Sequence, residues 1–156
     1  MGYKNIYRKF DFETSNFAIS QYINSAFLDT DITISNKFSL FASLLFNNTF
    51  NKNGTANQHY NNLLPSLSLL YKIGRNYNLK LDYSKKIRRP NANYLNPNLL
   101  FITPLYLLQG NPELLPQIIN TSELGLTKKF KNRSSASLKL YNVSHKDLIS
   151  QTFIET

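Results

Sequence analysis

The sequence contains no cysteine among its 156 residues. It can therefore form neither disulfides nor thiolate metal sites, although this leaves the cellular compartment open. No run of about 18 or more apolar residues occurs, which excludes a transmembrane helix. The first residues, MGYKNIYRKFDF, lack the apolar segment of a signal peptide. We therefore expect either a cytoplasmic protein or a piece of a longer exported one.

Acidic residues are scarce, with 9 Asp and Glu against 18 Lys and Arg, and the formal net charge is +9. Such an excess favours an anionic partner, which could be nucleic acid, lipopolysaccharide or an acidic solute. Most of the cations stand singly, as Lys80 and Lys139 do, and only residues 85–89 form a dense cluster. We interpret the single cations as parts of solvated faces in one domain, because the chain is too short for two ordinary ones.

Patterns typical of catalysis are missing. The two histidines lie far apart in the sequence, and there is no glycine-rich phosphate loop and no nucleophile elbow. Asp82, Glu113 and Glu123 are single carboxylates, which we expect to pair with lysines rather than to act as acid and base. The sequence predicts no enzyme, no metal site and no cofactor.

Apolar and polar residues alternate with a period of two, which is typical of β-strands. The clearest case is residues 77–83, where Tyr77, Leu81 and Tyr83 share one face and Lys80 and Asp82 the other. The alternation predicts about six strands, at residues 17–28, 32–50, 63–73, 77–87, 118–130 and 134–145. Period alone does not tell whether the apolar face meets a protein core or lipid.

The connections between these segments alternate in length. Residues 29–31, 74–76 and 131–133 are predicted as short turns, whereas residues 51–62 and 88–117 are predicted as long loops. Transmembrane barrels show this alternation, because short periplasmic turns face longer extracellular loops. The connections therefore favour a membrane barrel over a soluble sheet.

An ordered series of short motifs occupies the second long loop, which holds all but one of the six prolines. It follows a PSLSL segment at residues 65–69, and its members are Arg88, Arg89, Pro90, Leu95, Asn96, Pro97, Gly110, Asn111, Pro112, Leu114 and Pro116. Each motif alone is weak, but the set in this order resembles the central barrel signature of TonB-dependent outer-membrane receptors. The likeness is greatest to the outer-membrane β-barrel family common in Bacteroidetes.

The resemblance implies an all-β fold in which residues 1–156 are a partial outer-membrane barrel domain. This is an antiparallel transmembrane segment of an incomplete barrel, since transporters of this kind have about 22 strands. It also implies a location in the bacterial outer membrane and uptake of an unidentified nutrient. The implied partners are outer-membrane lipid and lipopolysaccharide, the plug and other strands of the receptor, and the TonB complex through missing parts only. Nucleic acid is not among them.

Two alternatives remain open. The proline-rich loop is either an architectural segment folded against the barrel mouth, or a site where Arg88 and Arg89 bind an anionic solute or a lipopolysaccharide phosphate. The whole chain could instead be a soluble basic β-sheet module for nucleic acid or polysaccharide. That function needs aromatic residues among the cations, but Tyr77 and Tyr83 lie opposite Lys80.

Overall fold

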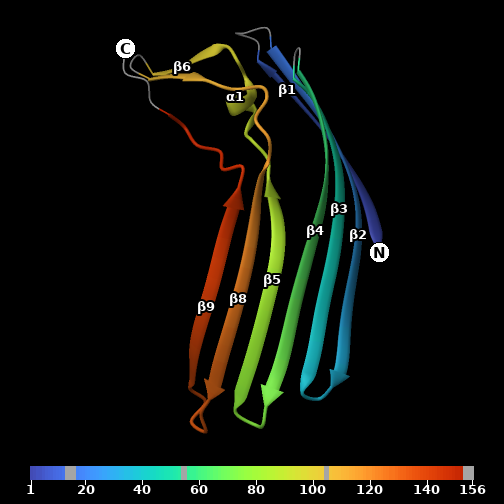
Figure 1. Cartoon of the computed structure of the whole chain (residues 1–156), viewed down its shortest axis with the longest axis vertical. Helices are drawn as coiled ribbons and strands as arrows, with labels where there is room; N and C mark the ends of the chain where they lie inside the picture. Colours follow the sequence, from blue (N-terminus) through green and yellow to red (C-terminus); the bar gives the residue numbers. More distant parts are fainter. Residues whose placement is uncertain (13–16, 54–55, 104–105, 153–156) are drawn as a thin grey trace.

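A computed structural model describes residues 1–12, 17–53, 56–103 and 106–152, and seven of its strands form one antiparallel sheet. The all-β, antiparallel and open architecture is confirmed, with one strand more than the six predicted (Figure 1). Every neighbour pair in this sheet is antiparallel. In spatial order the strands are β1 (Gly2–Phe12), β2 (Phe17–Ser35), β3 (Phe38–Asn53), β4 (Ala56–Ile73), β5 (Tyr77–Arg88), β8 (Gln117–Lys129) and β9 (Ser135–Lys146).

The remaining elements lie in the connection between β5 and β8. They are the short helix α1 (Ala92–Leu95) and a hairpin of β6 (Leu99–Thr103) and β7 (Tyr106–Gln109). The predicted long loop at 88–117 is thus confirmed in extent, but part of it is folded into regular structure. Within the described ranges, no helix is long and apolar enough to cross a membrane.

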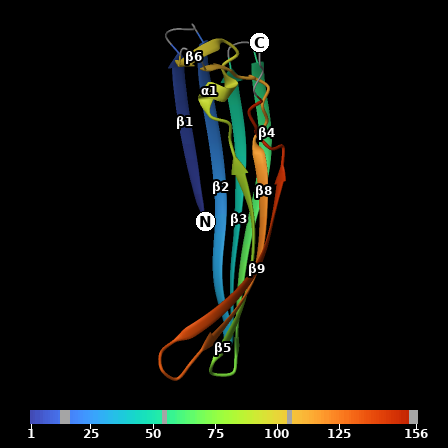
Figure 2. The same cartoon turned by 90° about the vertical axis from the view of Figure 1, so that its left-hand side faces the viewer.

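The sheet has two faces and two ends. We call inner the face against which α1 lies (Figure 2), and outer the opposite face. The end with α1 is the loop end, and the end with the connections at 36–37, 74–76 and 130–134 is the turn end (Figure 1). Directly opposed residues share a face, so pairing places Ile19 and Asn53 on the inner face and Phe46 and Leu63 on the outer face.

A band of apolar side chains covers the outer face from the turn end upward. Leu63 and Tyr71 lie eight residues apart on β4, which is about 26 Å along the strand at the usual rise. Outer-membrane barrels carry an outward apolar band about 25 Å tall. On β3, β4 and β5 the members of this outer band are Phe38, Leu40, Ala42, Leu44, Phe46, Leu63, Pro65, Leu67, Leu69, Tyr71, Tyr77, Leu79, Leu81 and Tyr83.

The predicted turn at residues 29–31 is wrong, because β2 continues through it to Ser35. The predicted strand at 32–50 is wrong at its start, because the connection between β2 and β3 lies inside it, at residues 36–37. Asp29 and Asp31 suggested a turn, yet both lie in the ladder, opposite Ser43 and Phe41. The Ser43 hydroxyl donates a hydrogen bond to Asp29 across the inner face. A polar inner face therefore accommodates carboxylates that would end a strand in an apolar core.

The predicted loop at 51–62 is also wrong, since β3 runs to Asn53 and β4 begins at Ala56. Polar side chains pair across these two strands: the Asn48 amide donates to Asn61 at 2.8 Å and the Asn51 amide to Gln58 at 3.4 Å. The strands extend past the apolar band as a polar ladder. Only the β5–β8 connection is long among those described, so the predicted alternation of loop lengths holds in part.

Strand β1 has no counterpart among the predicted strands. Its residues Lys4, Ile6 and Arg8 face inward, while Tyr3 and Tyr7 face outward, so neither face is cleanly apolar. Pairing with β2 holds this strand in the sheet. The paired residues extend from Gly2 opposite Phe27 to Phe12 opposite Phe17. The predicted turns at 74–76 and 131–133 are confirmed, with Gly74 and Arg133 at positive φ.

Candidate functional site

The proline-rich loop begins with α1, which is capped by a side chain. Asn91 accepts a hydrogen bond from the backbone N–H of Asn93 at 3.3 Å, and its carbonyl accepts one from Tyr94 at 3.0 Å. Asparagine is a favoured N-cap because its side chain satisfies an N–H that lacks a partner in the first turn. The cap starts one helical turn directly after Pro90, where the β5 ladder has ended.

Two motifs that are distant in sequence meet at the end of α1. The N–H of Gly110 donates to the Asn96 carbonyl at 2.8 Å, and the N–H of Asn111 donates to the Tyr94 carbonyl at 2.7 Å. A Cβ at position 110 would lie 2.5 Å from the carbonyl carbon and oxygen of Tyr94. The close approach thus requires glycine, and it joins the Leu95-Asn96-Pro97 and Gly110-Asn111-Pro112 motifs into one unit.

Both asparagine-proline pairs turn the chain by the same device. The Asn96 side chain accepts a hydrogen bond from the N–H of Asn98 at 3.0 Å, and the Asn111 side chain accepts one from Glu113 at 2.9 Å. These are Asx turns, in which a side chain replaces the backbone acceptor. Asn96 is fully buried. A buried amide needs hydrogen-bond partners, and the neighbouring Asn98 provides one.

The loop is fastened to the inner face of the long strands. The Gln58 amide donates to the carbonyls of Pro112 and Leu114, at 3.1 and 3.3 Å. Asn53 donates to the same Pro112 carbonyl at 3.2 Å, and Arg89 donates to the Thr49 hydroxyl at 3.2 Å. These bonds connect the loop to β3 and β4, whose polar extensions lie within the predicted loop at 51–62.

An apolar cluster of β2 and α1 side chains lies beneath the loop. It consists of Phe17 and Ile19 from β2 and Ala92 and Leu95 from α1, with Phe12 and Leu114 packed against it. Leu95 is 3% exposed and Ile19 2%. The loop therefore forms a small core with one corner of the sheet, at its loop end (Figure 2).

The predicted arginine pair is divided between two environments. Arg88 is the last residue of β5, opposite Gln117, and its side chain is exposed. Arg89 is half-buried, bonded to Thr49, and its Nε has no hydrogen-bond partner. Anion binding by these two arginines stays a prediction.

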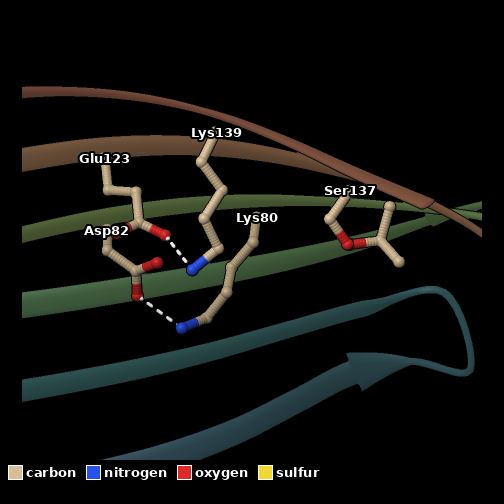
Figure 3. A network of polar contacts seen from close by, with 6 residues as sticks. Lys80, Asp82, Glu123, Ser137 and Lys139 are labelled. Atoms are coloured by element: carbon tan, nitrogen blue, oxygen red, sulfur yellow. Dashed lines mark hydrogen bonds and ion pairs between the residues drawn. The ribbon is translucent and has the colours of Figure 1, made fainter. Parts of the chain in front are cut away.

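A second group of charges lies lower on the inner face (Figure 3). Lys80 and Asp82 of β5 form an ion pair at 2.9 Å, and Lys139 of β9 pairs with Glu123 of β8 at 2.8 Å. Asp82 and Glu123 are directly opposed, while both lysines flank Gly125, which offers no side chain. The predicted pairing of Asp82 and Glu123 with lysines is confirmed. Glu113 has no ion-pair partner among the described residues.

This inner-face network is ionic rather than catalytic in its geometry. Each carboxylate is already neutralised by a lysine, and Thr127 and Ser137 bond to one another at 3.0 Å beside them. Among the described residues, no group of three or more acidic or histidine side chains could hold a metal. The arrangement provides a charged, hydrophilic lining on the face opposite to the apolar band.

Aromatic side chains mark the turn end of the outer face. Phe38 and Tyr71 face each other across β3 and β4 with ring centroids 6.4 Å apart. The Lys128 ammonium lies 5.4 Å from the ring centre of Tyr77 and 5.2 Å from that of Phe130. Aromatic rings at the edge of an apolar band are typical of the membrane–water interface.

Residues 2–156 match the sequence profile of the outer membrane protein beta-barrel family. No curated protein matches the chain. The match covers nearly the whole chain and agrees with the faces described above, one apolar and one charged.

Two solved structures share the fold at low sequence identity. The alcaligin outer membrane receptor FauA from Bordetella pertussis aligns with a TM-score of 0.54 and 16% identity, over 92% of this chain and 24% of that one. The siderophore receptor PirA from Pseudomonas aeruginosa aligns with a TM-score of 0.50 and 18% identity, over 84% and 32%. The chain thus spans about a quarter to a third of the length of these receptors. It belongs to the outer membrane protein beta-barrel family, and its open sheet shares the fold of part of these two structures.

Proposed function

We propose that residues 1–156 form one stretch of the wall of a nutrient-uptake receptor of the TonB-dependent kind. The observation that carries the proposal is the contrast between the two faces of an open sheet. Leu81 and Tyr83 face outward, whereas the ion pairs of Asp82 and Glu123 face inward. A sheet with lipid on one side and water on the other needs this arrangement.

The partners follow from the same geometry. Outer-membrane lipid and lipopolysaccharide surround the outer face, and further strands pair with the free edges of β1 and β9. A plug domain occupies the space beside the inner face, and the contact with the TonB complex is made by other parts of the receptor. The chain contributes no catalytic step.

The rival function, a soluble module for nucleic acid or polysaccharide, is not favoured by the arrangement of side chains. Binding of a single strand combines stacking aromatics with cations in one groove. Here Tyr77 and Tyr83 are separated on the outer face by Leu79 and Leu81, members of the apolar band, and Lys80 lies on the inner face. A soluble sheet would also leave the apolar band in water.

The orientation is tested by single cysteines, because the natural chain has none. Leu81→Cys and Leu67→Cys on the outer face are compared with Ser84→Cys and Ser66→Cys on the inner face, in outer membranes. We expect a membrane-impermeant maleimide to label the inner-face variants and a lipid-soluble maleimide the outer-face variants. Equal labelling of all four by the impermeant reagent would contradict a wall in lipid.

Uptake itself is tested in the source bacterium. A strain lacking the segment for residues 1–156 is grown with iron chelates, cobalamin or oligosaccharides as the limiting nutrient. Growth should fail on one nutrient only and return when the intact gene is restored. If growth is unchanged on every nutrient but the cysteines are labelled as expected, the chain is part of a barrel wall and the proposed uptake of these nutrients is wrong.

A further inference from the structure

The sheet opens between β4 and β5 near the loop end. Their ladder stops at Ser66 opposite Ser84, although β4 continues with β3 to Ala56 and β5 continues with β8 to Arg88. The next residue of β4 is Pro65, which has no N–H to donate. The upper parts of the two strands diverge beyond this point (Figure 1).

A cleft of about 440 Å³ occupies the place where these strands diverge. From β4 it is lined by Tyr60 and Asn62, which belong to the inner face. From the other side it is lined by Tyr83, Lys85 and Lys146, which belong to the outer face. Because side chains of both faces line one cleft, it cuts into the wall, and Tyr83, Lys85 and Lys146 bring outer-face side chains to it.

Two amines line this cleft without an ion-pair partner among the described residues. Within the described ranges, neither Lys85 nor Lys146 takes part in an ion pair or a side-chain hydrogen bond. Asp147 also lines the cleft but lies beyond ion-pair distance of both. The lining therefore carries an excess of positive charge, together with the Tyr60 hydroxyl and the Asn62 amide as neutral polar groups.

The cleft lies at a defined depth relative to the apolar band. Tyr83 is the last member of the band on β5, and Lys85 is the next outward residue toward the loop end. Lipid headgroups lie at this level, beyond the hydrocarbon core. Lys128, at the opposite end of the band, differs because its ammonium already lies over the rings of Tyr77 and Phe130.

We propose that this cleft is a binding site for the phosphate of a lipid headgroup in the outer leaflet. Lys85 and Lys146 provide the two positive charges for the phosphate oxygens, as ammonium groups commonly do at phosphate sites. Tyr83, the last member of the apolar band on β5, lines the cleft on the side where the lipid enters the hydrocarbon. The site does not depend on nutrient uptake, only on the position of the wall in the membrane.

The test counts lipids bound to the full chain in neutral detergent micelles by native mass spectrometry. Phosphatidylglycerol is titrated against phosphatidylcholine, in which a choline cation masks the phosphate charge. Lys85→Gln and Lys146→Gln are each expected to weaken phosphatidylglycerol binding about fivefold, and the double variant about 30-fold. Asp147→Asn is expected to strengthen it, because a nearby negative charge is removed.

The matched control is Lys128→Gln, which removes the same charge at the turn end and should leave binding unchanged. Strand content is compared by circular dichroism, so that an unfolded variant is recognised. If a lysine variant unfolds, the Asp147→Asn variant still tests the proposal, because loss of structure cannot strengthen phosphatidylglycerol binding. Equal effects of Lys85→Gln and Lys128→Gln would overturn the proposal. So would full displacement of the lipid by inorganic phosphate at equal concentration, which would indicate a site for soluble anions.

Discussion

The carbonyl oxygen of Tyr94 accepts a hydrogen bond from the N–H of Asn111 at 2.7 Å, across a hairpin that separates the two residues in the chain. This bond forms only because Gly110 brings its backbone against α1, where a Cβ would lie 2.5 Å from Tyr94. Backbone atoms cannot yield as the end of a long side chain does. The contact is therefore the most sensitive point of the folded loop.

Gly110→Ala is expected to release the loop from the sheet, at a cost of about 1–3 kcal/mol, the usual range for overpacking. Limited proteolysis should cut residues 89–116 faster while the long strands stay intact. Gly125→Ala is the control, because its Cβ would meet its nearest neighbour at 3.9 Å, an ordinary contact. Equal resistance of the two variants to protease would show that the close approach is not needed.

Gln58→Leu should loosen the same loop from the other side. Its amide donates to the carbonyls of Pro112 and Leu114, and although Asn53 still donates to the first, the second loses this donor, at a cost of about 1 kcal/mol. Hydrogen exchange at the N–H groups of Gly110 and Asn111 should become faster. Asn57→Leu, one residue away on the outer face, removes an amide without touching the loop and should leave exchange unchanged.

Leu81→Arg should lower the stability of the chain in lipid vesicles by about 2–4 kcal/mol, the cost of arginine near the middle of an outer-membrane barrel's apolar band. Leu81 is 45% exposed on the outer face. Ser84→Arg places the same side chain on the inner face and should cost little. Urea titration of the folded fraction compares the two, and an equal loss would contradict the assignment of faces.

Reversal of one charge on the inner face should be more harmful than its neutralisation. Glu123→Gln removes one ion pair, whereas Glu123→Lys adds a third cation to the face that already carries Lys80 and Lys139. The exchange of Glu123→Lys together with Lys139→Glu should recover part of the loss, because the pair is re-formed in reverse. Denaturant midpoints in micelles measure all three. A double variant that is no better than Glu123→Lys would show that the two side chains act independently.

The strand segments that the sequence reveals most clearly are those that carry the outer apolar band. Tyr77, Leu79, Leu81 and Tyr83 must all be apolar or amphipathic, so their period of two is visible in the sequence. The extensions of β3 beyond residue 50 and of β4 before residue 63 are not predicted, because they pair through polar side chains such as Asn51 and Gln58, which show no apolar period. The high asparagine content of these segments is compatible with a paired strand and with a loop, so composition does not distinguish the two.

In the proline-rich loop, the motifs are visible in the sequence but the contacts between them are not. Its motifs could be recognised as a set, but nothing in their order places Asn96 beside Gly110. That contact depends on β6 and β7 returning the chain to its starting point. In the same way, the carboxylate of Glu123 could be expected to meet a lysine, whereas the choice of Lys139 depends on the register between β8 and β9.

The direction of the two edge strands limits how the wall can be completed. β1 and β9 are the first and seventh strands of an antiparallel sheet, so both run from the turn end to the loop end. Two such edges meet in parallel, whether they come from one molecule or from copies that share an orientation in the membrane. A uniformly antiparallel cylinder therefore needs an odd number of intervening strands, the first and last of which run the opposite way. Copies of this sheet cannot supply them by joining edge to edge.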